Sequence, residues 1–289
     1  MLKHFLLLFV LTNGLGLVFA NAFLPPEINE QITQSITLVN DDKQDPVNSI
    51  ALLVYILVAT ALLLVIIKFF KTKMNVLFRV VEGIAIFFIT ISAFEILLYP
   101  LIGIDSTLTL LTLIIALAIV ILRNTMPENI WLRNLVTILL VSYIGALIGM
   151  GLGLIPIIIF IILLAIYDII AVFKTKHMVT LAKAVTKKNL AFTFAIPTKK
   201  HQFELGTGDI AIPLALAASV MQQYSSALLF PIYFLPAILI LVGSLVGLSA
   251  TLEYSSRHVG KALPALPLQT AFMIILVIVL QLIVPVYVL

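Results

Sequence analysis

Two aspartates lie inside strongly apolar stretches of the sequence, where a carboxylate is costly. Asp168 lies in AIYDIIAVF and Asp209 lies in GTGDIAIP. An aspartate at the centre of a membrane helix costs about 2.5 to 3.5 kcal/mol on insertion scales. Two carboxyl groups in one poorly solvated site share a proton, so that one is a base while the other is an acid. Such a pair can activate water and polarise a peptide carbonyl, which predicts hydrolysis without a covalent enzyme intermediate.

The residues around Asp209 predict an open backbone beside its carboxyl group. Gly206 and Gly208 weaken any helix that precedes the aspartate, and they allow another chain to approach closely. Pro213 has no N–H group that could bond the Asp209 carbonyl four residues earlier. In hydrocarbon, such irregular backbone is tolerated only beside protein or a water-filled cavity. We therefore expect Asp209 to line a wet pocket, where a substrate strand can pair with the exposed backbone.

A third irregular segment is LPALP, residues 263–267. Its two prolines, Pro264 and Pro267, resist regular helix, although a proline is tolerated in a first helical turn. The segment is either a distorted helix end that packs against the aspartates or an ordinary proline-rich helix start. Taken alone, the segment favours the ordinary helix start.

The elements that carry these residues must be membrane helices. Of the 289 residues, 62% are hydrophobic and 10% are charged, whereas a soluble domain carries about 25% charged residues. Because a membrane helix needs about 20 mainly apolar residues, we predict an all-α polytopic membrane protein with nine transmembrane helices in a single domain, residues 1–289. The predicted spans are approximately 5–24, 49–69, 82–104, 107–122, 132–149, 154–173, 208–226, 228–250 and 263–288.

The distribution of basic residues predicts the orientation of these helices. In the nine-helix arrangement, 16 of the 17 lysines and arginines fall on one side, and only Lys43 falls on the other. Basic residues gather on the cytoplasmic side, so we expect a cytoplasmic N-terminus, a cytoplasmic loop at 174–207 and a C-terminus outside. The net charge of +4 then comes from basic residues in short loops that orient the helices. We expect these residues to contact the lipid bilayer and not a nucleic acid.

The N-terminal segment and the loop 174–207 also show recognisable sequence patterns. Lys3, the apolar run and Ala20-Asn21-Ala22 also fit a cleavable signal peptide over residues 1–22, although we favour a first membrane helix. The loop 174–207 begins with KTKHMVTLAKAVTKK, which predicts an amphipathic helix along the membrane interface.

The predicted helices also decide how close the aspartates lie. Asp168 lies near the end of one predicted span and Asp209 near the start of the next, and both flank the loop 174–207. Because these helices are antiparallel, the two carboxyl groups can meet at a similar shallow depth.

The predicted spans lack the catalytic residues that other classes of protease need. The chain contains no cysteine, which excludes a thiolate nucleophile and cysteine metal ligands. His4, His177, His201 and His258 lie in loops or near an end, so neither a membrane zinc protease nor a serine–histidine protease has an imidazole available. We expect no metal and no cofactor.

The competing interpretation from another class is a proton-coupled transporter, since intramembrane acids relay protons and broken helices bind substrates near the midplane. Two observations weigh against it. The two aspartates lie near one surface, and no pair of corresponding broken helices occurs in the two halves of the chain.

Several other residues within the spans predict structural roles. We expect Glu95 to line a cavity or to be hydrogen-bonded, and Glu82 to lie at the interface. Tyr167 can orient a carboxylate or simply pack. Small-residue pairs at GxxxG spacing predict close helix contacts, and they are Gly145 with Gly149 and Gly243 with Gly247.

Three short motifs together resemble those of a known family. Tyr167-Asp168, Gly206-Thr207-Gly208-Asp209 and Pro264-Ala265-Leu266 resemble the YD, GxGD and PAL motifs of the presenilin and signal peptide peptidase intramembrane aspartyl proteases. The resemblance implies a presenilin-like fold and a catalytic dyad of Asp168 and Asp209. It also implies that the neighbouring motif residues shape the site, namely Tyr167, Gly206, Thr207, Gly208, Pro264, Ala265 and Leu266. The implied substrates are transmembrane peptides, cleaved within the bilayer.

Within that family, the details point in two directions. GDIAIP looks closer to signal peptide peptidases and LPALP closer to presenilins, while a cytoplasmic loop between the catalytic spans is the presenilin arrangement. We therefore expect single-span substrates whose N-terminus lies outside, and a compact, microbial presenilin homologue in the plasma membrane. Presenilins work with partner subunits and are cleaved in this loop, which makes AFTFAIP at 191–197 a candidate for cleavage. A compact chain favours activity without partner subunits, and an oligomer remains open.

Overall fold

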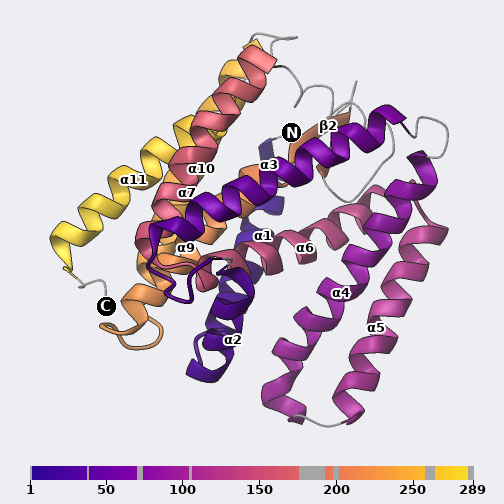
Figure 1. The fold of residues 1–289 in the computed structure, drawn as a ribbon, viewed down its shortest axis with the longest axis horizontal. Helices are drawn as coiled ribbons and strands as arrows, with labels where there is room; N and C mark the ends of the chain where they lie inside the picture. The colour runs from indigo at the N-terminus through magenta and orange to yellow at the C-terminus, as the bar shows by residue number, and fades with distance from the viewer. Residues whose placement is uncertain are drawn as a thin grey trace.

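Helices form most of the molecule, as its apolar composition requires (Figure 1). The structure is a computed structural model that describes residues 2–37, 39–69, 74–103, 106–175, 193–197, 202–257 and 264–285. In chain order the helices are α1 (Leu2–Ala22), α2 (Pro26–Ile36), α3 (Pro46–Phe69), α4 (Met74–Ile102), α5 (Ser106–Thr125), α6 (Ile130–Gly151), α7 (Leu154–Ile169), α9 (Gly208–Ser225), α10 (Phe234–Arg257) and α11 (Leu266–Ile283). A π-helical turn, η1 (Ile170–Thr175), extends α7, and two strands, β1 (Thr193–Pro197) and β2 (Gln202–Gly206), precede α9.

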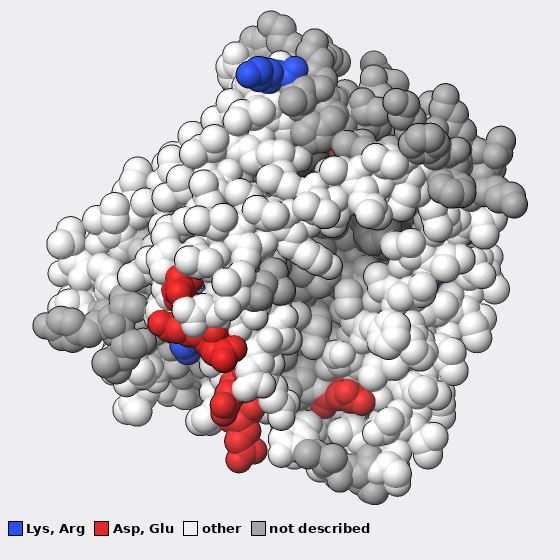
Figure 2. All heavy atoms as spheres, viewed as in Figure 1, with Lys and Arg blue, Asp and Glu red and all other residues white. Residues whose placement is uncertain are grey.

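The helices correspond to a polytopic membrane protein, which confirms the predicted all-α class. Within the described residues, eight helices are long and apolar enough to cross a membrane: α1, α3, α4, α5, α6, the helix made by α7 and η1, α10 and α11. The remaining predicted span is α9, which contains Asp209, Gln222 and Gln223. The count of nine spans and their orientation stay predictions. The face drawn in Figure 2 carries few charged side chains apart from an acidic band in its lower half.

The boundaries of several helices differ from those expected from hydropathy. Helix α4 begins earlier than predicted, and α10 begins later, because the residues after α9 form a turn around Pro231. Helix α2 was not predicted at all. Its only buried residue is Ile32, while Glu27 and Glu30 are exposed, so the segment is too polar to read as a span. Most of the predicted interfacial helix at 174–188 lies outside the described residues.

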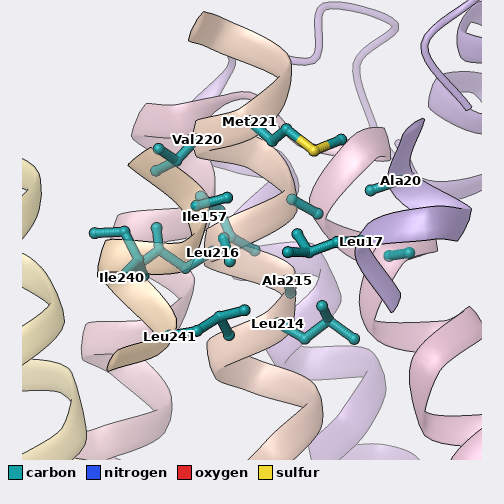
Figure 3. Packing of buried hydrophobic residues seen from close by; sticks show 14 of the residues in the cluster. Leu17, Ala20, Ile157, Leu214, Ala215, Leu216, Val220, Met221, Ile240 and Leu241 are labelled. Carbon is teal, nitrogen blue, oxygen red and sulfur yellow. The ribbon is translucent and has the colours of Figure 1, made fainter. Parts of the chain in front are cut away.

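Helix α9 lies at the centre of the bundle (Figure 3). Its side chains pack against α1, α7 and α10, with Leu214, Ala215 and Leu216 among the most buried residues of the molecule. Contact with α6 depends on the predicted small-residue pair. A Cβ atom on Gly149 would lie 2.1 Å from the carbonyl oxygen of Ala215, and one on Gly145 would lie 2.8 Å from a methyl group of Leu214. The glycines of α6 therefore bring α9, which carries Asp209, into direct backbone contact with its neighbour.

Helices α10 and α11 form a similar close pair, which lies side by side in Figure 1. A Cβ atom on Gly247 would lie 2.8 Å from the Cα atom of Gln269, and one on Gly243 would lie 2.3 Å from Leu276. Helix α11 also contacts α7, so its N-terminal end, which contains the PAL residues, approaches the end of α7 that carries Asp168.

The first helix is an integral part of the bundle. Phe5, Phe9 and Phe19 are buried, and the Ser142 hydroxyl of α6 donates a hydrogen bond of 2.7 Å to the Thr12 carbonyl. This packing supports the favoured interpretation of the segment as a membrane helix.

Candidate active site

Asp168 lies in the last turn of α7, where the helix changes to the π-helical turn η1. Its side chain is buried, with 7% exposure. The backbone N–H of Leu266 donates a hydrogen bond to the Oδ2 atom of Asp168 at 3.4 Å, and the backbone of Ala265 also donates to this carboxyl group. Single π-helical turns occur frequently at functional sites. The carboxyl group of Asp168 therefore lies directly at the N-terminal end of α11.

This contact bears on both interpretations of LPALP. Helix α11 begins at Leu266 with a proline at its start, as an ordinary helix start would. The same segment also packs against an aspartate, which was the alternative that the segment alone did not favour. Both descriptions hold, because the N–H groups of a first helical turn have no partner within the helix and are available to the Asp168 carboxyl group.

Asp209 is the second residue of α9, in its first turn. Its side chain is half-buried, and α9 contacts α7, the helix that carries Asp168. Gly206 approaches it from the preceding strand, since a Cβ atom there would lie 3.3 Å from the Oδ2 atom of Asp209. Thr207 immediately precedes α9, and its carbonyl accepts a hydrogen bond from the backbone N–H of Ala211 at 2.9 Å. Asp168 and Asp209 are thus carried by two helices that contact each other.

An antiparallel hairpin leads into Asp209, and sequence reasoning missed it. Strand β1 pairs with β2 in a register that places Phe194 opposite Leu205 and Ala195 opposite Glu204. Phe194 and Leu205 are buried. We expected a loop here, and each strand is only five residues long, which gives a weak sequence signal.

Polar side chains of α6 hold this hairpin. Asn134 donates to the Ala195 carbonyl at 2.8 Å and accepts the Ala195 N–H at 2.9 Å. Arg133 forms an ion pair with Glu204 at 2.6 Å, and the hydroxyl of Thr193 donates to the same carboxylate oxygen at 2.5 Å. Arg133 lies inside α6 and is 1% exposed. The sequence feature that could have indicated this ion pair is Glu204, the only acidic residue in the loop 174–207.

The hydrogen bonds of Asn134 fix which edge of the hairpin faces outward. In an antiparallel pair, opposite residues either bond each other or point their backbone groups away from each other, in alternation. Because the N–H and C=O of Ala195 point to α6, those of Glu204 and Gly206 point to the outer edge of β2. Pro197 then occupies a position whose missing N–H weakens no ladder bond. Gly206 is exposed, so the outer edge of β2 ends in open backbone beside Asp209.

The remaining residues singled out from the sequence lie around this centre or away from it. Tyr167 packs against the main apolar core, and Pro264 and Ala265 are half-buried beside α11. Glu95 lines a cavity of about 480 Å³ together with Tyr143, as expected. Glu82 is 5% exposed and forms an ion pair of 3.0 Å with Arg123; its expected position at the membrane interface stays a prediction.

Among the residues that the structure describes, no three His, Cys, Asp or Glu side chains converge on a point where a metal ion could bind. The residues of the candidate site are the two aspartates, the backbone of the first turn of α11 and the end of β2.

Comparison with known proteins identifies a family and a fold that this chain shares. The sequence profile described as "Signal-peptide peptidase, presenilin aspartyl protease" matches residues 7–204, a range that includes Asp168 and ends before Asp209. A search of curated proteins gave no match. One similar solved structure is a presenilin family intramembrane aspartate protease in a C222 crystal form, with 22% identity, a TM-score of 0.67, and coverage of 94% of this chain and 95% of that chain.

The same kind of protein in a P2 crystal form has 24% identity, a TM-score of 0.67, and coverage of 96% of both chains. At this identity the two structures establish the shared fold. The family profile covers more than half of the chain. The chain belongs to the signal-peptide peptidase and presenilin aspartyl protease family.

Proposed function

We propose that this protein is an intramembrane aspartyl endopeptidase of the GxGD type, in which Asp168 and Asp209 form the catalytic dyad. It hydrolyses peptide bonds within the transmembrane segments of single-span substrates. The observation that carries the proposal is the contact between α7, which ends with Asp168 in its last turn, and α9, which begins with Asp209 in its first turn. Membership of an aspartyl protease family supports it independently.

The chemistry needs one proton shared by the two carboxyl groups. The ionised aspartate takes a proton from a water molecule, and the hydroxide oxygen forms a bond to the carbonyl carbon of the substrate. The protonated aspartate donates its hydrogen bond to the carbonyl oxygen, which becomes a hydroxyl group of a tetrahedral diol. When the diol collapses, the C–N bond breaks, the protonated aspartate gives its proton to the leaving nitrogen, and the ionised aspartate takes a proton from one diol hydroxyl, whose oxygen becomes the carbonyl oxygen of the new carboxylic acid. The products are a new carboxyl terminus and a new amino terminus, and the dyad again holds one proton.

Each neighbouring motif residue has a role in this proposal. The amides of Leu266 and Ala265 hold the Asp168 carboxyl group in place, with Pro264 setting the path of the chain before α11. Gly206 leaves room for the Asp209 carboxyl group, and Thr207 and Gly208 complete the turn from β2 into α9. Tyr167, which precedes Asp168, packs against the core and fixes the end of α7.

A substrate helix must become extended before its peptide bond can reach the dyad, because helical N–H and C=O groups bond each other. The outer edge of β2 offers backbone partners that replace those bonds, as strand addition does in other proteins. Gly206 lies at the end of this edge, next to Asp209. A substrate strand paired with β2 would therefore pass directly over the two carboxyl groups.

The proposal includes the setting of the enzyme. The protein acts as one transmembrane domain over residues 1–289, with its N-terminus in the cytoplasm and its C-terminus outside, as the positive-inside rule favours. It cleaves substrates whose N-terminus lies outside, without partner subunits and without a cofactor. In a prokaryote its location is the plasma membrane.

Purified protein in detergent tests this function with a single-span peptide as substrate. We expect the native chain to cut the peptide within its apolar segment, and the variants Asp168→Ala and Asp209→Ala to have lost the activity. If both variants cut like the native chain, the assignment fails. If no condition gives cutting while a solute gradient drives flux through proteoliposomes, the protein is a transporter instead.

A further inference from the structure

The geometry points to Asn134 and Arg133 as positioning residues that hold the β1–β2 hairpin at one place on α6. In doing so they determine which peptide bond of a substrate lies over Asp168 and Asp209. This inference rests on the proposed protease function and on substrate pairing with β2. It adds a determinant of the cleavage position that lies on a different helix from either aspartate.

Asn134 occupies the outer edge of β1 as a neighbouring strand would. Its side-chain amide has one donor and one acceptor side, and it bonds both the C=O and the N–H of Ala195, at 2.8 and 2.9 Å. Asn134 is 6% exposed and Ala195 is fully buried, so water cannot readily replace either bond. Since unsatisfied buried backbone groups are costly, this two-point contact specifies one residue of β1 opposite α6.

Arg133 holds the second strand through its charge. Its guanidinium group is buried and pairs with Glu204 at 2.6 Å, and the Thr193 hydroxyl completes the contact from β1 at 2.5 Å. Breaking a buried ion pair leaves an uncompensated charge, which makes such pairs strongly selective for one geometry. Glu204 lies opposite Ala195 in the register, so both anchors act at the same rung of the hairpin.

The position of this rung determines the position of the substrate. Because Asn134 covers the outer edge of β1, the outer edge of β2 is the one that points away from α6, and it ends at Gly206 beside Asp209. One residue of a strand corresponds to about 3.3 Å. If the hairpin shifted by one residue along α6, a paired substrate would move by about that distance, which brings a different peptide bond over the dyad.

The test is a map of the cleavage sites in a single-span peptide, made by mass spectrometry of the products together with KM and kcat. We expect Asn134→Leu, which removes both bonds at similar volume, to spread cleavage over neighbouring bonds and to raise KM by about tenfold, the effect of one or two lost hydrogen bonds. Asn134→Asp keeps the acceptor for the Ala195 N–H and should spread cleavage over fewer bonds than Asn134→Leu. If Asn134→Leu does not fold, Asn134→Asp still tests the inference.

The ion pair is tested by exchange of its charges. Arg133→Glu and Glu204→Arg should each broaden the product pattern, and the double exchange should narrow it again. Thr193→Val, a milder change, removes one bond to Glu204 and should broaden the pattern slightly. The matched control is Thr137→Val, one turn further along α6, whose hydroxyl donates to the Arg133 carbonyl of its own helix and, within the described residues, to no atom of the hairpin; it should leave the cleavage sites unchanged.

The outcomes separate this inference from the proposed function. If the native chain cuts the peptide and a folded Asn134 variant gives the native cleavage sites at the native KM, the positioning role is wrong while the protease assignment stands. The same holds if Thr137→Val spreads the sites as much as Asn134→Leu, since the effect would then be general loosening of α6. If the native chain itself never cuts, the proposed function fails first.

Discussion

The backbone N–H of Leu266 lies 3.4 Å from the Oδ2 atom of Asp168, although 98 positions separate the two residues. This hydrogen bond joins the start of α11 to the end of α7. It gives the PAL segment a physical role, which is to hold one carboxyl group through a backbone amide. Among substitutions, only proline removes a backbone N–H group.

Proline at position 266 should therefore impair cleavage more than a change of side chain. Leu266→Pro removes the N–H group that bonds Asp168, and a hydrogen bond to a charged group contributes about 1.5 to 3 kcal/mol. We expect the catalytic rate to fall by about tenfold to a hundredfold. Leu266→Met keeps the amide and most of the buried volume, so its rate should stay within a few-fold of the native rate. Equal rates for the two variants in a peptide-cleavage assay would contradict this role.

The two glycines before Asp209 should differ in their tolerance of alanine. A Cβ atom on Gly206 would lie 3.3 Å from the Asp209 carboxyl oxygen, whereas one on Gly208 would lie 3.8 Å from a methyl group of Ile212, an ordinary contact. Gly206→Ala should thus displace the carboxyl group and lower kcat by about tenfold or more, equivalent to about 1.4 kcal/mol. Its melting temperature should hardly change, because Gly206 is exposed.

Gly208→Ala is the matched control for that measurement. We expect it to retain most of the native kcat in the same assay. A larger loss in Gly208→Ala than in Gly206→Ala would show that the close approach of Gly206 to Asp209 does not govern the site.

The ion pair between Glu82 and Arg123 should matter for stability and not for catalysis. Both side chains are buried, and the pair joins α4 to α5 at 3.0 Å. Removal of one partner from a buried pair costs about 3 to 5 kcal/mol, so Glu82→Gln should lower the free energy of unfolding in detergent by about that amount. The double variant Glu82→Gln with Arg123→Met should lose less than the sum of the two single changes. Additive losses, or a changed kcat of the folded fraction, would contradict this description.

The close contact between α6 and α9 predicts that Gly149 cannot be enlarged. A Cβ atom there would lie 2.1 Å from the Ala215 carbonyl oxygen, a backbone atom that cannot move by itself. Gly149→Ala should therefore destabilise the protein by about 1 to 3 kcal/mol or more and lower its melting temperature.

Gly14→Ala in α1 provides the comparison for Gly149→Ala, because nothing lies within 4 Å of a Cβ atom on Gly14. Alanine favours helix over glycine by about 1 kcal/mol, so the melting temperature of Gly14→Ala should be unchanged or higher. A fall as large as that of Gly149→Ala would mean that helix packing is not what the glycines provide.

The sequence was most informative where a feature extends over many residues or carries a high energetic cost. Apolar runs predicted the membrane helices, and the cost of a carboxylate in hydrocarbon singled out Asp168 and Asp209. The spacing of Gly145 and Gly149 predicted a close helix contact, which the structure places between α6 and α9. Each of these signals is carried by neighbouring residues or by one residue in an unfavourable setting.

The parts that could not be predicted depend on pairs that are distant in the sequence. Arg133 and Glu204 are 71 positions apart, and Arg123 and Glu82 are 41 apart. Each charge alone resembles an ordinary residue at the membrane interface, so nothing local marks it as buried. The hairpin was missed for a related reason, since its polar face is satisfied by Asn134 and Arg133 of α6 rather than by water.

The central claim is that Asp168 and Asp209 act as one unit, and kinetics of Asp168→Asn, Asp209→Asn and the double variant test it most directly. Asparagine keeps the shape of each side chain but cannot exchange the proton. Groups that act as a unit are not additive, so we predict that each single variant loses about 10⁴-fold in kcat, as members of a catalytic triad do, and that the double variant loses no more. A single variant with near-native kcat, or a double variant whose loss is the product of the two single losses, would contradict the claim.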